Sequence, residues 1–477
     1  MPNTLRLSDG SYMRHLDVKR VISYLLEMKC VEVLGFSNIG KSALMRLLAQ
    51  PDVWTQEIGE ISREFLPVYI DCNRMLEMTD QGFYELVLRC LQESGQEVAA
   101  LPGLQAAYQT LVQPQNEIQV PLSFSKGLRA VLDGTQRKLI LLLDEFDEPF
   151  ANIESRVFLN LRAEKDRNPD CLAYVTATNR PLTTGRTGLH SSEFCELFAH
   201  QRWQLAPLTL PDVERYARQR AEDQGLTLTP SDVHFLYQWT GGHPSMMEGL
   251  LRLLLHGLGE TSENPGPTPD PDAKDAQDRW TLHRRLTEEM RDNDTLQREC
   301  TKILQGFTEA ENDALLSLYR LDNRGAVIPQ AQIEAHLLGR LAEHHILLSV
   351  EGKLRPFSRL LAETIQRQGS AERGVATQLR VDLESGAVLV NGVAVETLTA
   401  LEYKLMLLLN ENEDKIVDKY QIVTAVWGEE YLDAVDDARI EKLISRLRQK
   451  VEPNTSDPRF ITTVRGRGYR LLINPEN

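Results

Sequence analysis

Over residues 1–200, short apolar runs alternate with amphipathic stretches in which apolar residues recur at helical spacing. The runs are rich in valine, leucine and isoleucine and are too short to be helices. This alternation is typical of a parallel β-sheet whose strands are connected by helices. The predicted strands are Val31–Gly35, Phe65–Cys72, Leu139–Asp144, Leu172–Thr178 and Trp203–Leu205.

The strand pattern stops after residue 210. Residues 211–256 show only helical periodicity, which predicts a helical lid after an α/β domain of residues 1–210. The segment 257–279 then carries prolines at alternate positions among acidic and hydroxyl residues, namely Pro265, Pro267, Pro269 and Pro271. Because proline at every second position blocks both a helix and a central strand, this segment predicts a solvated, semi-stiff linker.

Helical periodicity returns over residues 280–372, and near their end Ile346–Leu354 predicts a small hairpin. Helices closed by a hairpin indicate a winged-helix unit. A short polar joint at Gly369–Gly374 precedes the last domain, which we place at residues 377–477.

The composition is that of a globular protein of about three domains, with 477 residues, 42% hydrophobic and 26% charged. No apolar run reaches the roughly 18 residues that a membrane span requires, and the first residues lack the apolar core of a signal peptide. The six cysteines are scattered and lack metal-ligand spacing, which indicates reduced thiols. These features predict a cytoplasmic protein that does not bind membranes.

The first predicted strand leads into a glycine-rich segment with the spacing G-x-x-x-x-G-K-S, followed by a helix. This is a P-loop pattern, in which successive backbone N–H groups surround a phosphate at a helix N-terminus. We expect Lys41 to reach the β- and γ-phosphates of a nucleotide and the Ser42 hydroxyl to bind Mg²⁺. The residues of the loop predicted to bind ATP or ADP are Gly35, Ser37, Asn38, Ile39, Gly40, Lys41, Ser42 and Ala43.

The third predicted strand ends in two carboxylates. Asp144 is predicted to hold Mg²⁺ through water, and Glu145 to orient or activate the attacking water. A core strand ending on a solvated acidic turn gives the same pattern, but the P-loop upstream favours a nucleotide site. The fourth strand ends at Asn179 and Arg180, and Arg180 is either a γ-phosphate sensor or a surface cap.

Three further motifs are Gly10–Arg14, the Thr176–Arg180 end of the fourth strand, and Gly241–Pro244. With them, residues 10–256 resemble the STAND branch of AAA+-related P-loop ATPases, signalling proteins that include bacterial regulators and NB-ARC proteins. The resemblance implies that Arg14 and Pro244 line the adenine side of the nucleotide and that a winged-helix unit follows the lid. It also implies that ADP holds a closed form, whereas ATP with an inducer opens it for self-assembly, so that hydrolysis is a slow switch.

The formal net charge of −16 does not by itself favour binding to nucleic acid. However, the charge is unevenly distributed near the C-terminus. Arg439–Arg470 contains nine basic and three acidic residues, a net charge of +6, whereas Glu411–Asp437 contains two basic and nine acidic residues, a net charge of −7. This segregation predicts a dedicated cationic face that can meet phosphate.

The basic segment begins with a predicted helix. Asp436 or Asp437 can cap it, and it runs to about Val451. An apolar stripe lies along it beside a cationic one, and such a helix fits the major groove. Val464–Leu471 is predicted to be the second strand of a hairpin that contacts phosphate or the minor groove. The predicted DNA-binding residues are Arg439, Lys442, Arg446, Lys450, Arg465 and Arg467.

The segments Leu398–Tyr403, Ile444–Lys450 and Ile461–Leu471 are landmarks of one family. On them, residues 377–477 resemble the effector domain of OmpR/PhoB-type response regulators. In that pattern Arg448 faces inward to a carboxylate rather than to DNA. No receiver domain precedes this domain, and the ATPase-like module takes its place in the chain.

The two resemblances together imply a fold of class α/β plus α+β: a P-loop ASCE parallel sheet with a helical lid, followed by two winged-helix units. They imply a transcription regulator whose ATPase switch controls oligomerisation and binding to double-stranded operator DNA. RNA polymerase and an unidentified inducer are candidate partners. The implied cofactors are ATP or ADP and Mg²⁺.

Two other interpretations stay open. An AAA+ DNA-remodelling factor, such as a replication or transposition initiator, also joins an ATPase to winged helices and would use ATP turnover on DNA. A STAND-type defence scaffold would carry a fused nuclease, protease or membrane effector, and the sequence shows no such motif.

Overall fold

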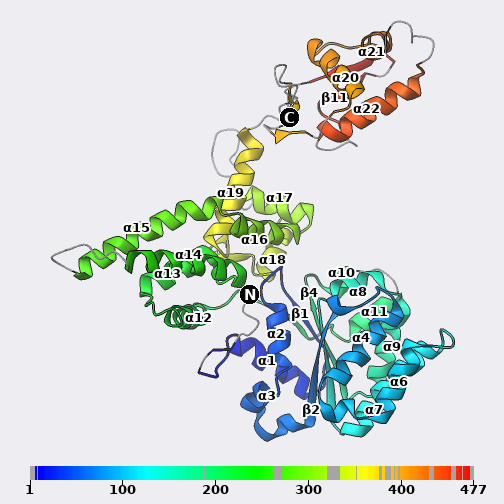
Figure 1. The fold of residues 1–477 in the computed structure, drawn as a ribbon, viewed down its shortest axis with the longest axis vertical. Coiled ribbons are helices and arrows are strands. Elements are labelled where there is room, and N and C mark those ends of the chain that lie inside the picture. The colour runs from blue at the N-terminus through cyan, green and yellow to red at the C-terminus, as the bar shows by residue number, and fades with distance from the viewer. Residues whose placement is uncertain are drawn as a thin grey trace. The chain divides into compact units, whose positions relative to one another are not determined.

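The computed structural model describes residues 6–7, 9–185, 189–262, 271–319, 333–350, 352–374, 379–381, 388–390, 393–395, 398–428, 435–452, 458–464 and 466–472. The chain divides into two compact units, Met1–Ile365 and Gln366–Asn477 (Figure 1). The division falls within α19 (Arg359–Gly374). Within the described ranges, no helix is both long and apolar enough to cross a membrane.

A five-stranded parallel sheet in the order β2-β3-β4-β1-β5 forms the centre of the first unit. All five predicted strands are confirmed, with ends that differ by at most one residue from the prediction. Both faces of the sheet are covered, which explains why its central strands are continuous apolar runs. The strands are β1 (Val31–Leu34), β2 (Phe65–Asp71), β3 (Lys138–Asp144), β4 (Leu172–Thr178) and β5 (Arg202–Gln204).

The two faces of the sheet pack into two separate apolar clusters. Successive residues of β3 alternate between them: Leu142 belongs to the cluster that includes α1, α2 and the lid, and Leu143 to the cluster that includes α4, α7 and α9. The helices up to β5 are α1 (His15–Leu26), α2 (Lys41–Leu48), α3 (Pro51–Ile58), α4 (Asp80–Glu93), α5 (Gln96–Ala99), α6 (Pro102–Val112), α7 (Gln119–Thr135), α8 (Asp147–Asn152), α9 (Ser155–Arg167), α10 (Leu182–Gly185) and α11 (Leu189–Glu196), with short 3-10 turns at Gly59–Glu64 and Cys72–Arg74.

The predicted helical lid is confirmed as α12 (Leu210–Glu222), α13 (Pro230–Thr240) and α14 (Pro244–Ser262). The linker predicted at 257–279 is wrong at both ends, since α14 continues to Ser262 and α15 (Pro271–Asp292) begins at a proline. Proline is tolerated there because the first turn of a helix does not use its backbone N–H. The prolines at 265, 267 and 269 lie outside the described residues.

A buried carboxylate fixes α15 to the lid. Asp232 is fully buried and accepts hydrogen bonds from Arg279 and His283, which lie one turn apart on α15. The same carboxylate caps α13 through the backbone N–H of Thr229. Because a buried carboxylate needs all of its partners, this arrangement holds α15 against α13.

The first winged-helix-like unit follows, with α16 (Asp294–Gln305), α17 (Glu309–Ser317) and α18 (Ala335–Glu343). The predicted hairpin is confirmed: β6 (Leu347–Val350) and β7 (Lys353–Pro356) pair antiparallel. Apolar residues of this unit and of the lid join the cluster on the α2 face of the sheet, so these parts share one core.

The second unit is a winged helix with a hydrophobic core of its own. A three-stranded antiparallel sheet, β8 (Leu379–Val381), β9 (Val388–Val390) and β10 (Val393–Ala394), precedes α20 (Ala400–Glu411), α21 (Lys419–Val426) and α22 (Asp437–Val451). The hairpin of β11 (Ile461–Val464) and β12 (Gly468–Leu471) closes the domain.

The predicted second strand at Val464–Leu471 begins too early. Val464 ends β11, and the chain turns before β12 begins at Gly468. Gly466 and Gly468 have φ values of 71° and 137°, which favour glycine. A Cβ on Gly468 would lie 2.1 Å from the carbonyl oxygen of Val417, so the turn packs tightly on the chain before α21.

Candidate nucleotide site and nucleic-acid interface

The predicted P-loop joins β1 to α2 and leaves the helix N-terminus open. Gly40 occupies the N-cap position with a φ of 106°, and no side chain caps the first turn. Asn38 also has a positive φ, of 57°. The N–H groups of the first turn therefore face the loop with no side-chain acceptor on them, an arrangement that binds anions.

Lys41 is buried at the centre of this loop. Its Nζ donates to the carbonyl oxygen of Gly35 at 2.7 Å and to Oδ1 of Asn179 at 2.8 Å. Burial lowers the pKa of Lys41, while the charges of Glu145 and Asp147 act in the opposite direction. Phosphate oxygens could replace both of its acceptors, so the ammonium group is available for the predicted role.

The residues predicted to form the metal site lie close together, although they come from α2 and from the end of β3. Ser42 Oγ lies 3.2 Å from Oδ1 of Asp144 and 3.4 Å from Oε1 of Glu145. Burial raises the pKa of Asp144, and hydrogen bonds from Tyr69 and Ser42 oppose the rise. A hydroxyl and a carboxylate at one edge of the sheet are ligands that Mg²⁺ prefers, so the residues present fit this ion.

Lys41, Ser42 and Glu145 line one cleft of about 200 Å³, whereas Asp144 does not line it and reaches it through Ser42. Three residues of the loop that were predicted to bind nucleotide do not line the cleft, namely Gly35, Ser37 and Ile39. Gly35 packs against Ile39, which is buried in the core, and the carbonyl oxygen of Ser37 contacts the lid. The residues that line the cleft are Asn38, Gly40, Lys41, Ser42, Ala43, Arg46 and Glu145.

Arg180 does not point at this cleft. Its guanidinium donates to the carbonyl oxygen of Gly306, directly after α16, at 3.1 Å from Nε and 2.8 Å from Nη2. The contact from the end of β4 to Lys41 comes instead from Asn179, whose backbone N–H is held by Asp147 at 3.0 Å. Asn179 was not among the predicted site residues, although its position directly after a buried strand was a usable signal.

Arg14 and Pro244 meet at the P-loop from two different elements. A Cβ on Gly40 would lie 3.5 Å from the guanidinium of Arg14 and 3.7 Å from the ring of Pro244. Arg14 is buried and donates to the carbonyl oxygens of Ile39 at 2.5 Å and Ala206 at 2.8 Å. It thus fastens the loop to the segment before the lid, and its buried Nε has no partner among the described residues.

The lid reaches the P-loop through His243, which is fully buried. Its Nε2 lies 3.0 Å from the carbonyl oxygen of Ser37, and its Nδ1 accepts the N–H of Met246 at 3.3 Å. These partners assign the ring proton to Nε2. The ring stacks on Phe36 with centroids 5.7 Å apart, and burial lowers the pKa of His243 to about 4.

This buried histidine predicts an acid-sensitive fold. An unfolded histidine gains its proton near pH 6.5, whereas folded His243 stays neutral to about pH 4. Stability should therefore fall as the pH drops from 6.5 to 5, by about 2 kcal/mol. Urea unfolding at several pH values measures this slope, and His243→Gln should remove most of it. An equal slope in the variant would assign the acid sensitivity to other groups.

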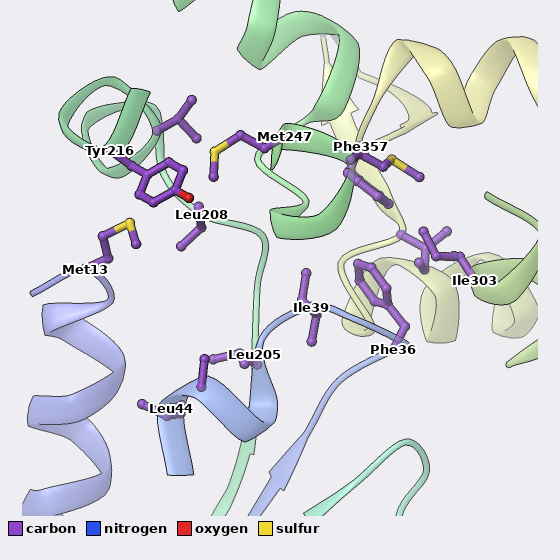
Figure 2. Packing of buried hydrophobic residues seen from close by; sticks show 14 of the residues in the cluster. Met13, Phe36, Ile39, Leu44, Leu205, Leu208, Tyr216, Met247, Ile303 and Phe357 are labelled. Atoms are coloured by element: carbon purple, nitrogen blue, oxygen red, sulfur yellow. The ribbon is translucent and has the colours of Figure 1, made fainter. Parts of the chain in front are cut away.

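The winged-helix-like unit also contacts the P-loop. Asn38 Nδ2 donates to Oε2 of Glu299 on α16 at 2.7 Å, and Glu299 pairs with Lys302 at 2.8 Å. Figure 2 shows Phe36 of the loop in one apolar group with Ile303 of α16 and Phe357. The tip of the loop is therefore held by the lid and by the winged-helix-like unit at the same time.

In the second unit, the predicted cap and apolar stripe of α22 are confirmed. Asp436 accepts the N–H of Arg439 at 2.9 Å, and the apolar side of the helix is buried. Arg439, Lys442 and Arg446 lie on the exposed side. Arg467 is exposed at the turn of the hairpin, and Arg465 lies outside the described residues.

Lys450 does not belong with these cations. Its Nζ pairs with Oε2 of Glu402 at 2.9 Å, and Glu402 is a buried residue of the capping box of α20. The prediction that Lys450 contacts DNA is thus corrected to an ion pair between α22 and α20. Arg448 does face inward as predicted, but its partners are the carbonyl oxygen of Ile461 and the hydroxyl of Thr463 rather than a carboxylate.

A second cleft, of about 380 Å³, separates α22 from the hairpin. Lys419, at the start of α21, and Arg467 place positive charge along it, and Glu441 of α22 lies on its other wall. Lys419 also pairs with Asp437, and that hydrogen bond raises the pKa of Lys419.

Residues 394–471 match the family described as "Transcriptional regulatory protein, C terminal". An uncharacterized transcriptional regulatory protein, YcbL, of Bacillus subtilis is 40% identical over 94 residues, which cover 20% of this chain and 40% of that protein. The sensory transduction protein RegX3 of Mycobacterium leprae is 37% identical over 93 residues, or 20% of this chain and 46% of that protein. The match thus spans less than half of the length of these relatives.

Solved structures resemble the two units separately. A Walker-type ATPase of Pyrococcus abyssi covers 76% of this chain and 98% of its own, with 13% identity and a TM-score of 0.44. The RstA DNA-binding domain of Klebsiella pneumoniae, in complex with the RstA box, covers 20% of this chain and 91% of its own, with 27% identity and a TM-score of 0.17. By the family match and by the loop geometry, the chain joins a domain that is similar, over residues 394–471, to the C-terminal domains of transcriptional regulatory proteins to an N-terminal unit with a P-loop on a five-stranded parallel sheet.

Proposed function

We propose that this protein is an ATP-binding, sequence-specific DNA-binding transcription regulator in which a STAND-type switch controls oligomerisation and operator binding. One observation carries the proposal. The tip of the P-loop, the segment that would surround the phosphates, is held by His243 of the lid and by Glu299 of the winged-helix-like unit. A nucleotide that changes the loop must therefore also act on these two contacts.

The residues of the cleft support slow ATP hydrolysis. Lys41 would leave the carbonyl of Gly35 for phosphate oxygens, and Ser42 with Asp144 would hold Mg²⁺. When bound, this ion neutralises charge on the transferring phosphoryl group. Glu145 would orient the attacking water; its φ of 52° is rare for this residue type, as is common at functional sites.

The contact between Asn38 and Glu299 supports a switch. Glu299 is buried beside the loop, and its carboxylate places negative charge near the site that would take the phosphates of ATP. Binding of ATP and formation of the contact between Asn38 and Glu299 then oppose each other. The effect is reciprocal: the factor by which bound ATP weakens the contact equals the factor by which the contact lowers the affinity for ATP. An inducer that releases α16 would act in this way.

Oligomerisation would couple the switch to DNA. Two or more DNA-binding domains in one assembly raise the effective concentration of each domain at adjacent operator half-sites. Arg439, Lys442 and Arg446 would enter the major groove, and Arg467 would contact the backbone beside it. RNA polymerase is a further candidate partner at the promoter.

The alternative, a DNA-remodelling initiator, requires DNA contacts from the ATPase unit as well. In the described part of that unit, α18 precedes the hairpin of β6 and β7, and its Arg340 pairs with Glu311 at 2.8 Å. His336 of the same helix pairs with Glu334 at 3.3 Å. This charge pairing favours a regulator with one dedicated DNA-binding domain. An initiator would melt duplex DNA in an ATP-dependent assay, and a regulator would not.

The switch is tested with Glu299→Ala, which removes the partner of Asn38 without touching the nucleotide cleft. Hydrogen bonds to charged groups contribute about 1.5–3 kcal/mol, so we expect half-maximal assembly at roughly tenfold lower ATP. Light scattering measures assembly, and fluorescence anisotropy measures operator binding in the same samples.

Glu289→Ala, at an exposed position of α15, is the matched control and should behave as wild type. An unchanged ATP requirement in Glu299→Ala would contradict the proposed role of the contact between Asn38 and Glu299. Assembly that shifts while operator affinity stays constant would contradict the coupling to DNA.

A further inference from the structure

Both oxygens of the Asp144 carboxylate are engaged, and only one of them faces the P-loop. Ser42 Oγ lies 3.2 Å from Oδ1, and the hydroxyl of Tyr69 donates to Oδ2 at 2.7 Å. The carboxylate is buried, so a side-chain oxygen without a donor would be costly there. Tyr69 thus supplies the second of two hydrogen bonds that together define the rotation of this group.

The sheet places Tyr69 at this position. Strand β2 pairs in parallel with β3, with Asp71 opposite Asp144, so Tyr69 lies two residues before the same edge of the sheet. Its ring packs on the α2 face, next to the cluster that contains the helix of the P-loop. Neither its spacing nor its type belongs to the P-loop or to the acidic pair, and the sequence gives no signal for it.

Arg46 contacts the aromatic ring of Tyr69. It lies four residues after Ser42 on α2, hence on the same side of the helix, and it lines the nucleotide cleft. Its guanidinium carbon is 5.4 Å from the centroid of the Tyr69 ring, within the range of a cation–π contact. The ring is therefore fixed both by apolar packing and by the contact with Arg46.

The hydroxyl of Tyr69 can act only as a donor to Asp144. A carboxylate oxygen can only accept, so the phenol O–H is the donor in the 2.7 Å hydrogen bond to Oδ2. With this donor on Oδ2, Oδ1 is the oxygen that faces Ser42, at 3.2 Å from its Oγ.

We propose that Tyr69, held by Arg46, is a positioning residue for Mg²⁺ at the nucleotide site. It fixes the Asp144 carboxylate so that Oδ1 and Ser42 Oγ are presented together to the ion. This inference rests on the proposed nucleotide function and extends it to residues outside the P-loop and the acidic pair. Outer-shell partners of metal ligands act in this way by orienting the ligand before the ion arrives.

The test is Tyr69→Phe in the full chain, because it removes only the hydroxyl and keeps the ring under Arg46. Binding of a fluorescent ATP analogue is measured in EDTA and across a Mg²⁺ titration. In EDTA, the affinity should stay within about twofold of wild type, since the loop itself is unchanged. The Mg²⁺ concentration at half-saturation should rise roughly tenfold, the lower end of the cost of losing an outer-shell partner.

Two further variants separate positioning from mere stability. Tyr24→Phe is the matched control, since its ring also lies under an arginine, with Arg20 at 4.7 Å, but away from the cleft. Arg46→Ala should shift the Mg²⁺ midpoint in the same direction as Tyr69→Phe. The double variant should shift it less than the product of the two, because both changes act through one hydrogen bond.

Each outcome decides between specific alternatives. A wild-type Mg²⁺ midpoint in Tyr69→Phe would overturn the positioning role. An equal loss of affinity in EDTA and in Mg²⁺ would also overturn it, because it would show that Tyr69 supports the loop rather than the metal. Absence of nucleotide binding by the wild-type protein in every condition would instead contradict the proposed nucleotide function itself.

Discussion

Lys41→Ala should lower the affinity for ATP by roughly 100-fold or more. Lys41 is the one predicted phosphate contact that is both buried and charged, and it now donates to two acceptors that phosphate oxygens could replace. Each charge-assisted hydrogen bond contributes about 1.5–3 kcal/mol, and the loss of two corresponds to a change of this size. Isothermal titration with ATP and Mg²⁺ measures it.

The same variant tests the coupling of the two ends of the chain. Genome-wide DNA footprinting of wild type and Lys41→Ala, with the bound nucleotide identified in each, should show that ATP-dependent assembly and promoter response are lost together. Lys41→Met keeps the apolar stem in its buried position and guards against a folding defect, and Lys19→Ala on the exposed side of α1 is the neutral control. Promoter regulation that persists without nucleotide would refute the switch.

Arg446→Ala should weaken operator binding about 10- to 100-fold. The residue lies on the exposed side of α22, between Lys442 and the end of the helix, where a bidentate contact to guanine contributes about 1–3 kcal/mol. Anisotropy with an operator fragment recovered by footprinting measures the affinity. Because a lost base contact also relaxes sequence preference, the ratio of operator to random DNA should fall with it.

Lys450→Ala provides the contrast on the same helix. Its partner Glu402 is buried, so the change should destabilise the second unit, by about 2 kcal/mol. Operator affinity below the melting transition should stay near wild type. The reverse pattern, with Lys450→Ala weakening DNA binding at constant stability, would restore Lys450 to the DNA face and contradict the ion pair as its main role.

Local patterns in the sequence predicted much of the fold. The five parallel strands, the cap at Asp436 and the apolar stripe of α22 all follow from periodicity and residue type over a few positions. The juxtaposition of Ser42 and Asp144 could also be predicted, because the carboxyl ends of parallel strands meet at one edge of the sheet.

The features that the sequence did not predict depend on contacts between residues that are far apart in the chain. Arg180 was equally compatible with a sensor and with a cap, and its contact with Gly306 lies 126 residues away in the chain. The bond from Asn38 to Glu299 spans 261 residues. Lys450 fits a cationic stripe at helical spacing. Only the position of Glu402 on α20 shows that Lys450 forms an ion pair within the domain. Spacing along one helix cannot reveal which neighbour a side chain will meet.

The separate hydrophobic core of the second unit has a consequence for the history of this protein. The residues of that cluster all lie between Leu379 and Leu471, so the first unit contributes none of them. A joint between Ile365 and Leu379 therefore divides the chain without removing a residue from either cluster. Under the proposed function, exchange of the first unit at this joint would connect the same promoters to a different signal.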